Sequence, residues 1–146
     1  MYYVNQEQID LRLSFIPTLI QACRELQEAH STAGPASATL LFHLAQERTL
    51  HLAIETVTDI GSLLIDAFMM RDASSYEDIV DILEGEGVVE APTAGTLKAL
   101  VQLRRLLAQD YADIVRDGLH PLVEALPEAL ETFAEAVPAF IRKEVL

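Results

Sequence analysis

The stretch ERTLHLAIETVTDIGSLLID, residues 47–66, forms the centre of the longest helix that the sequence predicts. Apolar residues recur at three- and four-residue spacings through it and beyond both its ends, as on one face of an α-helix. They are Leu41, Leu44, Leu52, Ile60, Leu64 and Phe68. We therefore expect one helix from about Ala38 to Met70. Gly61 has no capping role in its middle, so it predicts a point where another helix approaches closely.

A second helix is expected before this one, from about Asn5 to Ala29. Asn5 is a good N-cap, and Gln8 follows three residues later. Apolar residues again keep helical spacing, and Pro17 should kink the helix. A loop carrying Gly34 and Pro35 should join the two helices.

Three further helices should follow the long one. Ser74 and Glu77 form a capping-box pattern that opens a short helix, which Gly85 and Gly87 should end. The next runs from Pro92 or Thr93 to about Tyr111. The last starts near Pro121 and should be interrupted or bent at Pro127 and Pro138. The sequence thus predicts an all-α fold: one domain, residues 1–146, built as an antiparallel bundle of about five helices.

Composition narrows the class of protein. The chain has 146 residues, 51% of them apolar, which suffices for a core without disulfides, and its single cysteine excludes an internal disulfide. The absence of a signal-like start or a membrane-length apolar run favours a cytoplasmic protein. A net charge of −13 argues against DNA and against general RNA binding, because phosphates are repelled. A local basic patch remains at Lys98, Arg104 and Arg105.

Polar residues gather at the end of the fourth expected helix, in RRLLAQDY, residues 104–111. Arg104 and Tyr111, seven residues apart, share a face of a straight helix. Arg104 and Gln109 are five residues apart, so on a straight helix their side chains point in directions that differ by roughly 140° around the helix axis. The last two could address one ligand only if the helix ends or distorts there, or if a second chain completes the pocket.

Three segments, in order, resemble HepT-like proteins of the HEPN superfamily. The family signature of Arg, four residues, His, one residue and Tyr is matched by Arg104 and Tyr111, with Gln109 at the His position. The long helix is similar in Arg48, Glu55 and Asp59-Ile60-Gly61. RDASSYEDIVDILEGEGVV, which starts at Arg71, resembles the family's Arg-Asp, Ser-Tyr segment.

The resemblance implies a metal-independent RNA endonuclease of a toxin–antitoxin module. It implies a homodimer with a site at its interface and a minimal nucleotidyltransferase as antitoxin, which transfers AMP to Tyr111. No cofactor is expected. Arg104 would hold a phosphate, and Gln109 can form hydrogen bonds but cannot shuttle a proton, so activity should be weak or lost. The expected catalytic group is Arg104, Gln109 and Tyr111. The expected supporting residues are Arg48, Glu55, Asp59, Arg71, Asp72, Arg105 and Asp110.

Two alternatives stay open. The first is a non-catalytic helical dimer that serves as a protein-interaction module. The second, a metal-dependent bundle enzyme, ranks below it. His43, Glu47, His51, Glu55 and Asp59 follow one another at four-residue spacing. Each step drifts by about 40°, so the five cannot form one large site, and we expect them to pair within the helix with no metal.

Overall fold

The computed structural model describes residues 2–32 and 39–146. This part of the chain holds seven α-helices and one short 3₁₀ helix, without strands. The helices are α1 (Gln6–Leu13), α2 (Ile16–Thr32), α3 (Leu40–Ala67), α4 (Tyr76–Gly85), α5 (Ala91–Val101), α6 (Arg104–Ala108) and α7 (Pro121–Val145), and η2 (Tyr111–Asp113) is the 3₁₀ helix. The all-α bundle is confirmed, although the first and fourth expected helices are each divided in two.

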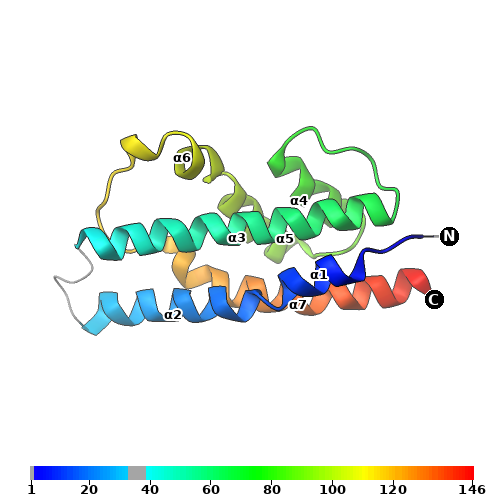
Figure 1. The fold of residues 1–146 in the computed structure, drawn as a ribbon, viewed down its shortest axis with the longest axis horizontal. Helices are drawn as coiled ribbons and strands as arrows, with labels where there is room; N and C mark the ends of the chain where they lie inside the picture. Colours follow the sequence, from blue (N-terminus) through cyan, green and yellow to red (C-terminus); the bar gives the residue numbers. More distant parts are fainter. Residues whose placement is uncertain (1, 33–38) are drawn as a thin grey trace.

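The long helices set the layout (Figure 1). The α2 helix runs antiparallel to α3 and α7 and packs against both. The α4–α5 hairpin packs on α3, with α5 also on α7, and α6 lies over the first half of α3. No helix within residues 2–32 or 39–146 is long and apolar enough to cross a membrane.

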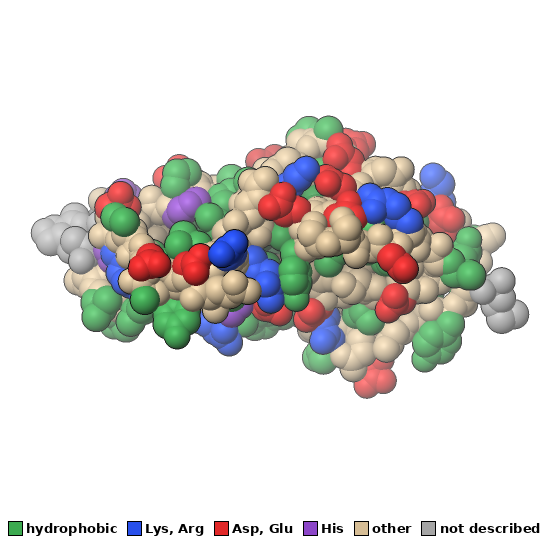
Figure 2. Space-filling model, turned by 90° about the horizontal axis from the view of Figure 1, so that it is seen from above, with side chains coloured by type: hydrophobic (Ala, Val, Ile, Leu, Met, Phe, Trp, Pro, Cys, Tyr) green, Lys and Arg blue, Asp and Glu red, His purple; other side chains and the backbone are tan. Residues whose placement is uncertain are grey.

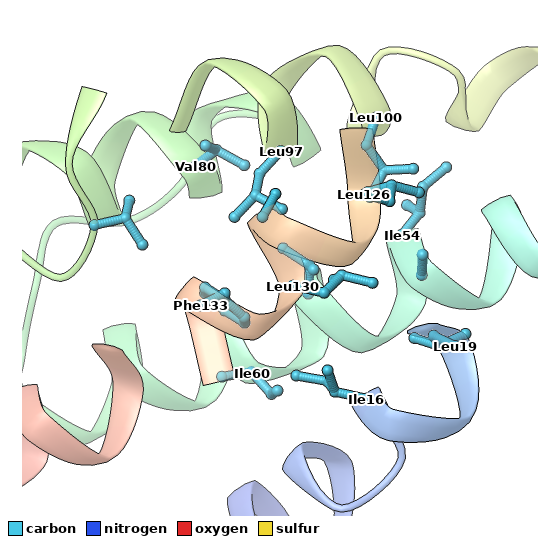
Figure 3. Packing of buried hydrophobic residues seen from close by; sticks show 14 of the residues in the cluster. Ile16, Leu19, Ile54, Ile60, Val80, Leu97, Leu100, Leu126, Leu130 and Phe133 are labelled. Carbon is cyan, nitrogen blue, oxygen red and sulfur yellow. The ribbon is translucent and has the colours of Figure 1, made fainter. Parts of the chain in front are cut away.

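The core lies where α2, α3, α5 and α7 meet (Figure 3). Leu97, Leu100, Leu126, Leu130 and Phe133 have no exposed surface, and they pack with residues of α2 and α3. Removing a side chain such as that of Phe133 would cost about 3–5 kcal/mol of stability. This main core cluster fixes α5, and through it the segment that follows.

The helix ends confirm some predictions and correct others. Asn5 caps α1, because its side chain accepts the N–H of Gln8, and Pro121 stands in the first turn of α7. The break between α1 and α2 lies at Ser14 and Phe15, ahead of Pro17. Neither Pro127 nor Pro138 interrupts α7, which is one continuous helix, and a bend at either proline stays a prediction.

The start of the apolar stripe predicted for α3 is not covered by the other helices that the structure describes. Leu41 is 78% exposed and Leu44 is 46% exposed, whereas Ile60 and Leu64 are fully buried. The periodicity is helical throughout, but neighbours cover only part of the first half of α3. The prediction for Gly61 is confirmed: a Cβ there would clash with Cγ2 of Ile79 on α4. The expected loop residues Gly34 and Pro35 lie outside the described residues, and α2 continues to Thr32, past the end expected at Ala29.

Candidate functional site

The helix that carries the RRLLAQDY segment breaks on both sides of α6. After Val101 the chain makes a turn at Gln102 and Leu103, and α6 begins at Arg104. It ends five residues later, where the N–H groups of Gln109 and Asp110 both bond to the carbonyl of Arg105 at 2.9 Å. The sequence contains no glycine or proline at either break, so an unbroken helix to Tyr111 was expected.

The second break changes the geometry expected for the site. Because the helix ends at Ala108, the prediction that Arg104 and Tyr111 share one helix face was wrong. Gln109 stands at the C-cap of α6, and Tyr111 opens η2. The helix therefore ends between Arg104 and Gln109, which is the condition under which both could address one ligand.

Arg104 has an unusual environment for an arginine in so acidic a protein. Its Cζ lies 3.8 Å from the centroid of the Tyr76 ring. Its Nε is buried and has no hydrogen-bond partner. Six of the ten Lys and Arg residues form ion pairs within the described chain, but Arg104 forms none. The six are Arg12, Arg24, Arg71, Lys98, Arg105 and Arg116.

Tyr76 reaches Arg104 from the first residue of α4, whose start is held by polar contacts. Ser75 is the N-cap, and its Oγ accepts the N–H of Asp78 at 3.0 Å. The Asp78 carboxylate accepts two bonds from Arg71, at 2.6 and 2.8 Å, and bonds from the N–H and hydroxyl of Ser74. These contacts hold the pKa of Asp78 well below its usual value, and the hydrogen bonds from Arg71 have the largest effect.

This arrangement revises two expectations for the segment. The capping box expected at Ser74 and Glu77 does not form: Ser75 is the N-cap, and the Asp78 carboxylate accepts the N–H of Ser74. Arg71, expected near the pocket, is engaged by Asp78, which raises the pKa of Arg71. Asp72 is exposed and accepts a 3.5 Å bond from Arg71 through its backbone carbonyl. Both residues thus order the loop that leads to Tyr76.

Two more contacts join α4 to α5 in the same antiparallel register. Lys98 bonds to Asp81 at 3.1 Å, which raises the pKa of Lys98. Gln102 bonds to Glu77 at 3.5 Å. This contact lies next to that of Arg104 with Tyr76, since Glu77 follows Tyr76 directly in α4. Lys98 is therefore paired with a carboxylate of α4 at the protein surface, where 40% of the Lys98 side chain and 42% of the Asp81 side chain are exposed.

The basic patch expected at Lys98, Arg104 and Arg105 is smaller than the sequence indicates, because carboxylates pair with two of the three cations. Arg105 is 81% exposed at its side chain and lies 3.4 Å from Asp110. Basic and acidic side chains alternate over the face that carries α4, α5 and α6 (Figure 2). Of the three clustered cations, Arg104 is the one that no carboxylate of the described residues neutralises.

Gln109 and Tyr111 are open to solvent. Gln109 is exposed, and Tyr111 is 62% exposed. The histidines that might replace an imidazole at Gln109 have other partners. His51 lies 3.5 Å from Glu55 on α3, and Nδ1 of His120 accepts the N–H of Leu122 at the start of α7.

The supporting residues expected on α3 do not bond to Arg104. Asp59 pairs with Arg12 of α1 at 3.1 Å, and Glu55 pairs with His51. Arg48 is exposed and has no ion pair among the described residues. These side chains lie along the outer part of α3, with 42% of Glu55 and 45% of Asp59 accessible.

The five histidines and carboxylates that follow one another at four-residue spacing on α3 bond mainly to other elements. The expectation that they pair within the helix was therefore largely wrong. Glu47 accepts two bonds from Arg116, at 2.8 and 3.0 Å. His43 bonds through Nδ1 to the Thr39 carbonyl and accepts the N–H of Gly118 at Nε2, which fixes its tautomer. Only His51 and Glu55 pair within the helix. In residues 2–32 and 39–146, no three potential ligands cluster closely enough for a metal.

The loop from η2 to α7 is fastened to α3 by contacts that the sequence did not predict. The Gln46 amide donates to the Gly118 carbonyl at 3.0 Å and accepts the N–H of His120 at 2.7 Å. With Leu103, Leu106 and other residues these groups line a groove of about 380 Å³ between α3 and α6. Within the sequence, only the pair Asp117-Gly118, which is typical of a turn, indicates that the chain changes direction in this loop.

Comparison with known proteins gives one consistent result. The profile of the family described as "Ribonuclease HepT-like" matches residues 19–137. The Bacillus subtilis protein named "Putative RNase YutE" is 32% identical over 145 residues, which is 99% of this chain and 95% of that protein. Its solved structure, described as a cytosolic protein of unknown function, superposes with a TM-score of 0.84 over the same shares of both chains.

More distant solved structures share the fold. A tri-AMPylated HEPN toxin of Shewanella oneidensis, in complex with an MNT antitoxin, has a TM-score of 0.74 at 19% identity, covering 90% of this chain and 96% of that chain. A toxin–antitoxin structure with AMP-PNP has a TM-score of 0.71 at 17% identity, covering 93% and 98%. At these identities the likeness is one of fold.

Proposed function

The chain belongs to the HepT-like ribonuclease family, and from this premise we propose that it binds RNA through Arg104 and cleaves it weakly or not at all. Arg104 holds a phosphate, and Gln109 replaces the imidazole that would move the proton of the ribose hydroxyl. The site lies at the interface of a homodimer, in the cytoplasm.

The environment of Arg104 supports this proposal most strongly. A guanidinium that is half-buried, stacked on an aromatic ring and not neutralised by a carboxylate keeps its N–H donors for an incoming anion. Arginine presents a planar fork that matches phosphate geometry. In a protein with a net charge of −13, an unpaired arginine at a helix break is best explained by a ligand that arrives later.

Loss of the proton carrier follows from the residues near Arg104. Gln109 can orient a ligand by hydrogen bonding but does not titrate. General acid–base catalysis contributes about 10²- to 10⁴-fold to a rate, so a missing imidazole would remove most of the activity. His51 and His120 are engaged elsewhere on α3 and at the start of α7.

The test restores the imidazole. Gln109→His should raise cleavage of single-stranded RNA by about 10²-fold or more, with a pH dependence centred near 6.5. Adding Arg104→Ala should abolish the gain, and Gln109→Asn is the matched control without a titrating group. If wild-type protein already cleaves RNA well, another residue moves the proton, and His51→Gln and His120→Gln would identify it. If Gln109→His stays inert while Arg104 still binds RNA, the weakening has another cause.

Exposed leucines favour the homodimer. Leu40, Leu41 and Leu44 on α3 and Leu106 on α6 are 63%, 78%, 46% and 37% exposed. A symmetric pairing is the commonest way to cover such a surface. Light scattering should give twice the monomer mass, and Leu41→Glu with Leu44→Glu should shift the protein toward monomer. A monodisperse monomer of the wild type at high concentration would rule the dimer out.

A nucleotidyltransferase is the proposed partner, with Tyr111 as the AMP acceptor. The phenol is exposed just past α6, where a second protein can reach it. The likeness in fold to an AMPylated toxin bound to its antitoxin supports this kind of partner. With a nucleotidyltransferase and ATP, intact mass should increase by one or more AMP groups, and Tyr111→Phe should remove the label at that site. Undiminished labelling of Tyr111→Phe would refute the assignment.

The second candidate function is a protein-interaction module without chemistry, favoured by the same exposed leucines on α3. It predicts a dimer whose affinity for RNA does not depend on Arg104. Equal RNA affinities of the wild type and Arg104→Ala would favour this function over the first.

A further inference from the structure

We propose that Tyr76 is the positioning residue for Arg104: its ring holds the guanidinium at the break between α5 and α6 and leaves the N–H donors open to a phosphate. The inference rests on the proposed function, in which Arg104 binds RNA. Tyr76 itself makes no bond to the ligand in this arrangement.

The contact is close and specific. The Cζ atom of Arg104 lies 3.8 Å from the ring centroid of Tyr76, within the range in which a cation is attracted to the face of an aromatic ring. The Nε atom is buried on the protein side without a hydrogen-bond partner. With one edge of the guanidinium enclosed in this way, the two terminal amino groups remain to meet an anion.

An aromatic support differs from a carboxylate in its effect on the site. A carboxylate would orient Arg104 equally well, as Asp81 orients Lys98, but it would also occupy N–H donors and cancel the charge. A ring contacts the face of the guanidinium and uses none of its five donors. Tyr76 therefore restricts the side chain without reducing its capacity for phosphate.

The ring is itself fixed in place. Tyr76 follows the N-cap residue Ser75, and the bonds of Asp78 to Arg71 and Ser74 hold the preceding loop. The adjacent contact of Glu77 with Gln102 sets the distance between α4 and the residue before the break. The polar cluster at the start of α4 thus acts on Arg104 through Tyr76, which was not among the site residues expected from the sequence.

A magnetic-resonance measurement tests the stack directly, without reference to activity. The Nε–Hε resonance of Arg104, next to an aromatic face, should show a ring-current shift in the wild type. Tyr76→Phe keeps the ring and should preserve that shift, whereas Tyr76→Leu should abolish it. Tyr3→Leu is the matched control, since Tyr3 is 82% exposed. Circular dichroism confirms that each variant is folded.

RNA binding tests the consequence. The affinity of full-length protein for a fluorescein-labelled ten-nucleotide single-stranded RNA should fall about 2- to 30-fold in Tyr76→Leu and less than about twofold in Tyr76→Phe. In an Arg104→Ala background, Tyr76→Leu should cause no further loss. A purely structural role would instead weaken binding equally in both backgrounds.

The outcomes separate the two proposals. If Arg104→Ala leaves RNA affinity unchanged, the proposed function fails, and the Hε resonance still decides whether Tyr76 orients Arg104. If Arg104→Ala weakens RNA binding while folded Tyr76→Leu matches wild type in both affinity and Hε shift, the proposed function stands and the positioning role of Tyr76 is refuted.

Discussion

Gln46→Leu should destabilise the protein by about 2–4 kcal/mol. The substitution keeps a branched side chain, shorter by one atom, and removes the amide groups that donate one bond and accept one. Gln46 is 7% exposed and bridges the Gly118 carbonyl, at 3.0 Å, and the N–H of His120, at 2.7 Å. Each buried backbone group left unpaired costs about 1–3 kcal/mol. Gly118 and His120 are only partly buried, so water can replace part of the lost bonding. The expected loss of stability is therefore smaller than twice the full cost of an unpaired group.

Urea unfolding followed by circular dichroism measures this loss, and the denaturant slope should not change. Gln21→Leu is the matched control: that glutamine is exposed and bonds to Glu25, so the change should stay within about 0.5 kcal/mol. Hydrogen exchange adds a local measurement, because the amide of His120 should lose protection in Gln46→Leu. A loss no larger than that of the control, with His120 still protected, would show that Gln46 does not fasten the loop.

Three further outcomes follow from packing and protonation. Gly61→Ala should lower the free energy of unfolding by about 1–2 kcal/mol, because the clash with Ile79 outweighs the better helix propensity of alanine. Gly95→Ala, where nothing lies within 4 Å, is its control and should stabilise, and an equal gain in both variants would contradict the close approach. Burial lowers the pKa of His120 below 6.5, so the unfolded chain takes up the proton first and stability should fall as the pH falls below about 6.5. Thermal unfolding of His120→Asn should show a weaker pH dependence, and an unchanged profile would rule this out. Burial raises the pKa of the Cys23 thiol to about 11, so a disulfide reagent at pH 8 should react only after unfolding, and rapid labelling of the native protein would refute the assignment.

The fold could be predicted wherever local chemistry decides it. Asn5 caps α1, Pro121 opens α7, and Gly61 marks a close approach, because capping, proline geometry and a missing side chain act within a few residues. Exposure was harder to predict. Leu41 and Leu44 keep helical spacing, but the spacing does not say where the neighbouring helices stop.

The residues of the candidate site came from the family signature, which does not contain their geometry. Arg104 was expected from the family signature, whereas the break before it has no local cause in the sequence. Its partner Tyr76 is 28 positions earlier in the chain (104 minus 76), and the two meet only because α4 packs on α5. Gln46 and His43 were missed as loop contacts for the same reason, since each bonds to backbone more than 70 residues away.

The pairing of six of the ten cations within the subunit determines how RNA binding should respond to salt. For single strands, the logarithm of the binding constant falls with the logarithm of salt concentration by about 0.7 for each phosphate neutralised, as bound counterions are released. Arg104 is the cation proposed to meet a phosphate, and one such contact per subunit gives a slope of about −1.4 for the proposed dimer. From 50 to 200 mM salt, affinity should fall less than about tenfold, whereas proteins with six to ten phosphate contacts lose about 10³- to 10⁵-fold. Repulsion by the net charge of −13 weakens the dependence further, because the same salt screens it. The RNA affinity of this protein should therefore depend far less on salt than that of proteins with many phosphate contacts.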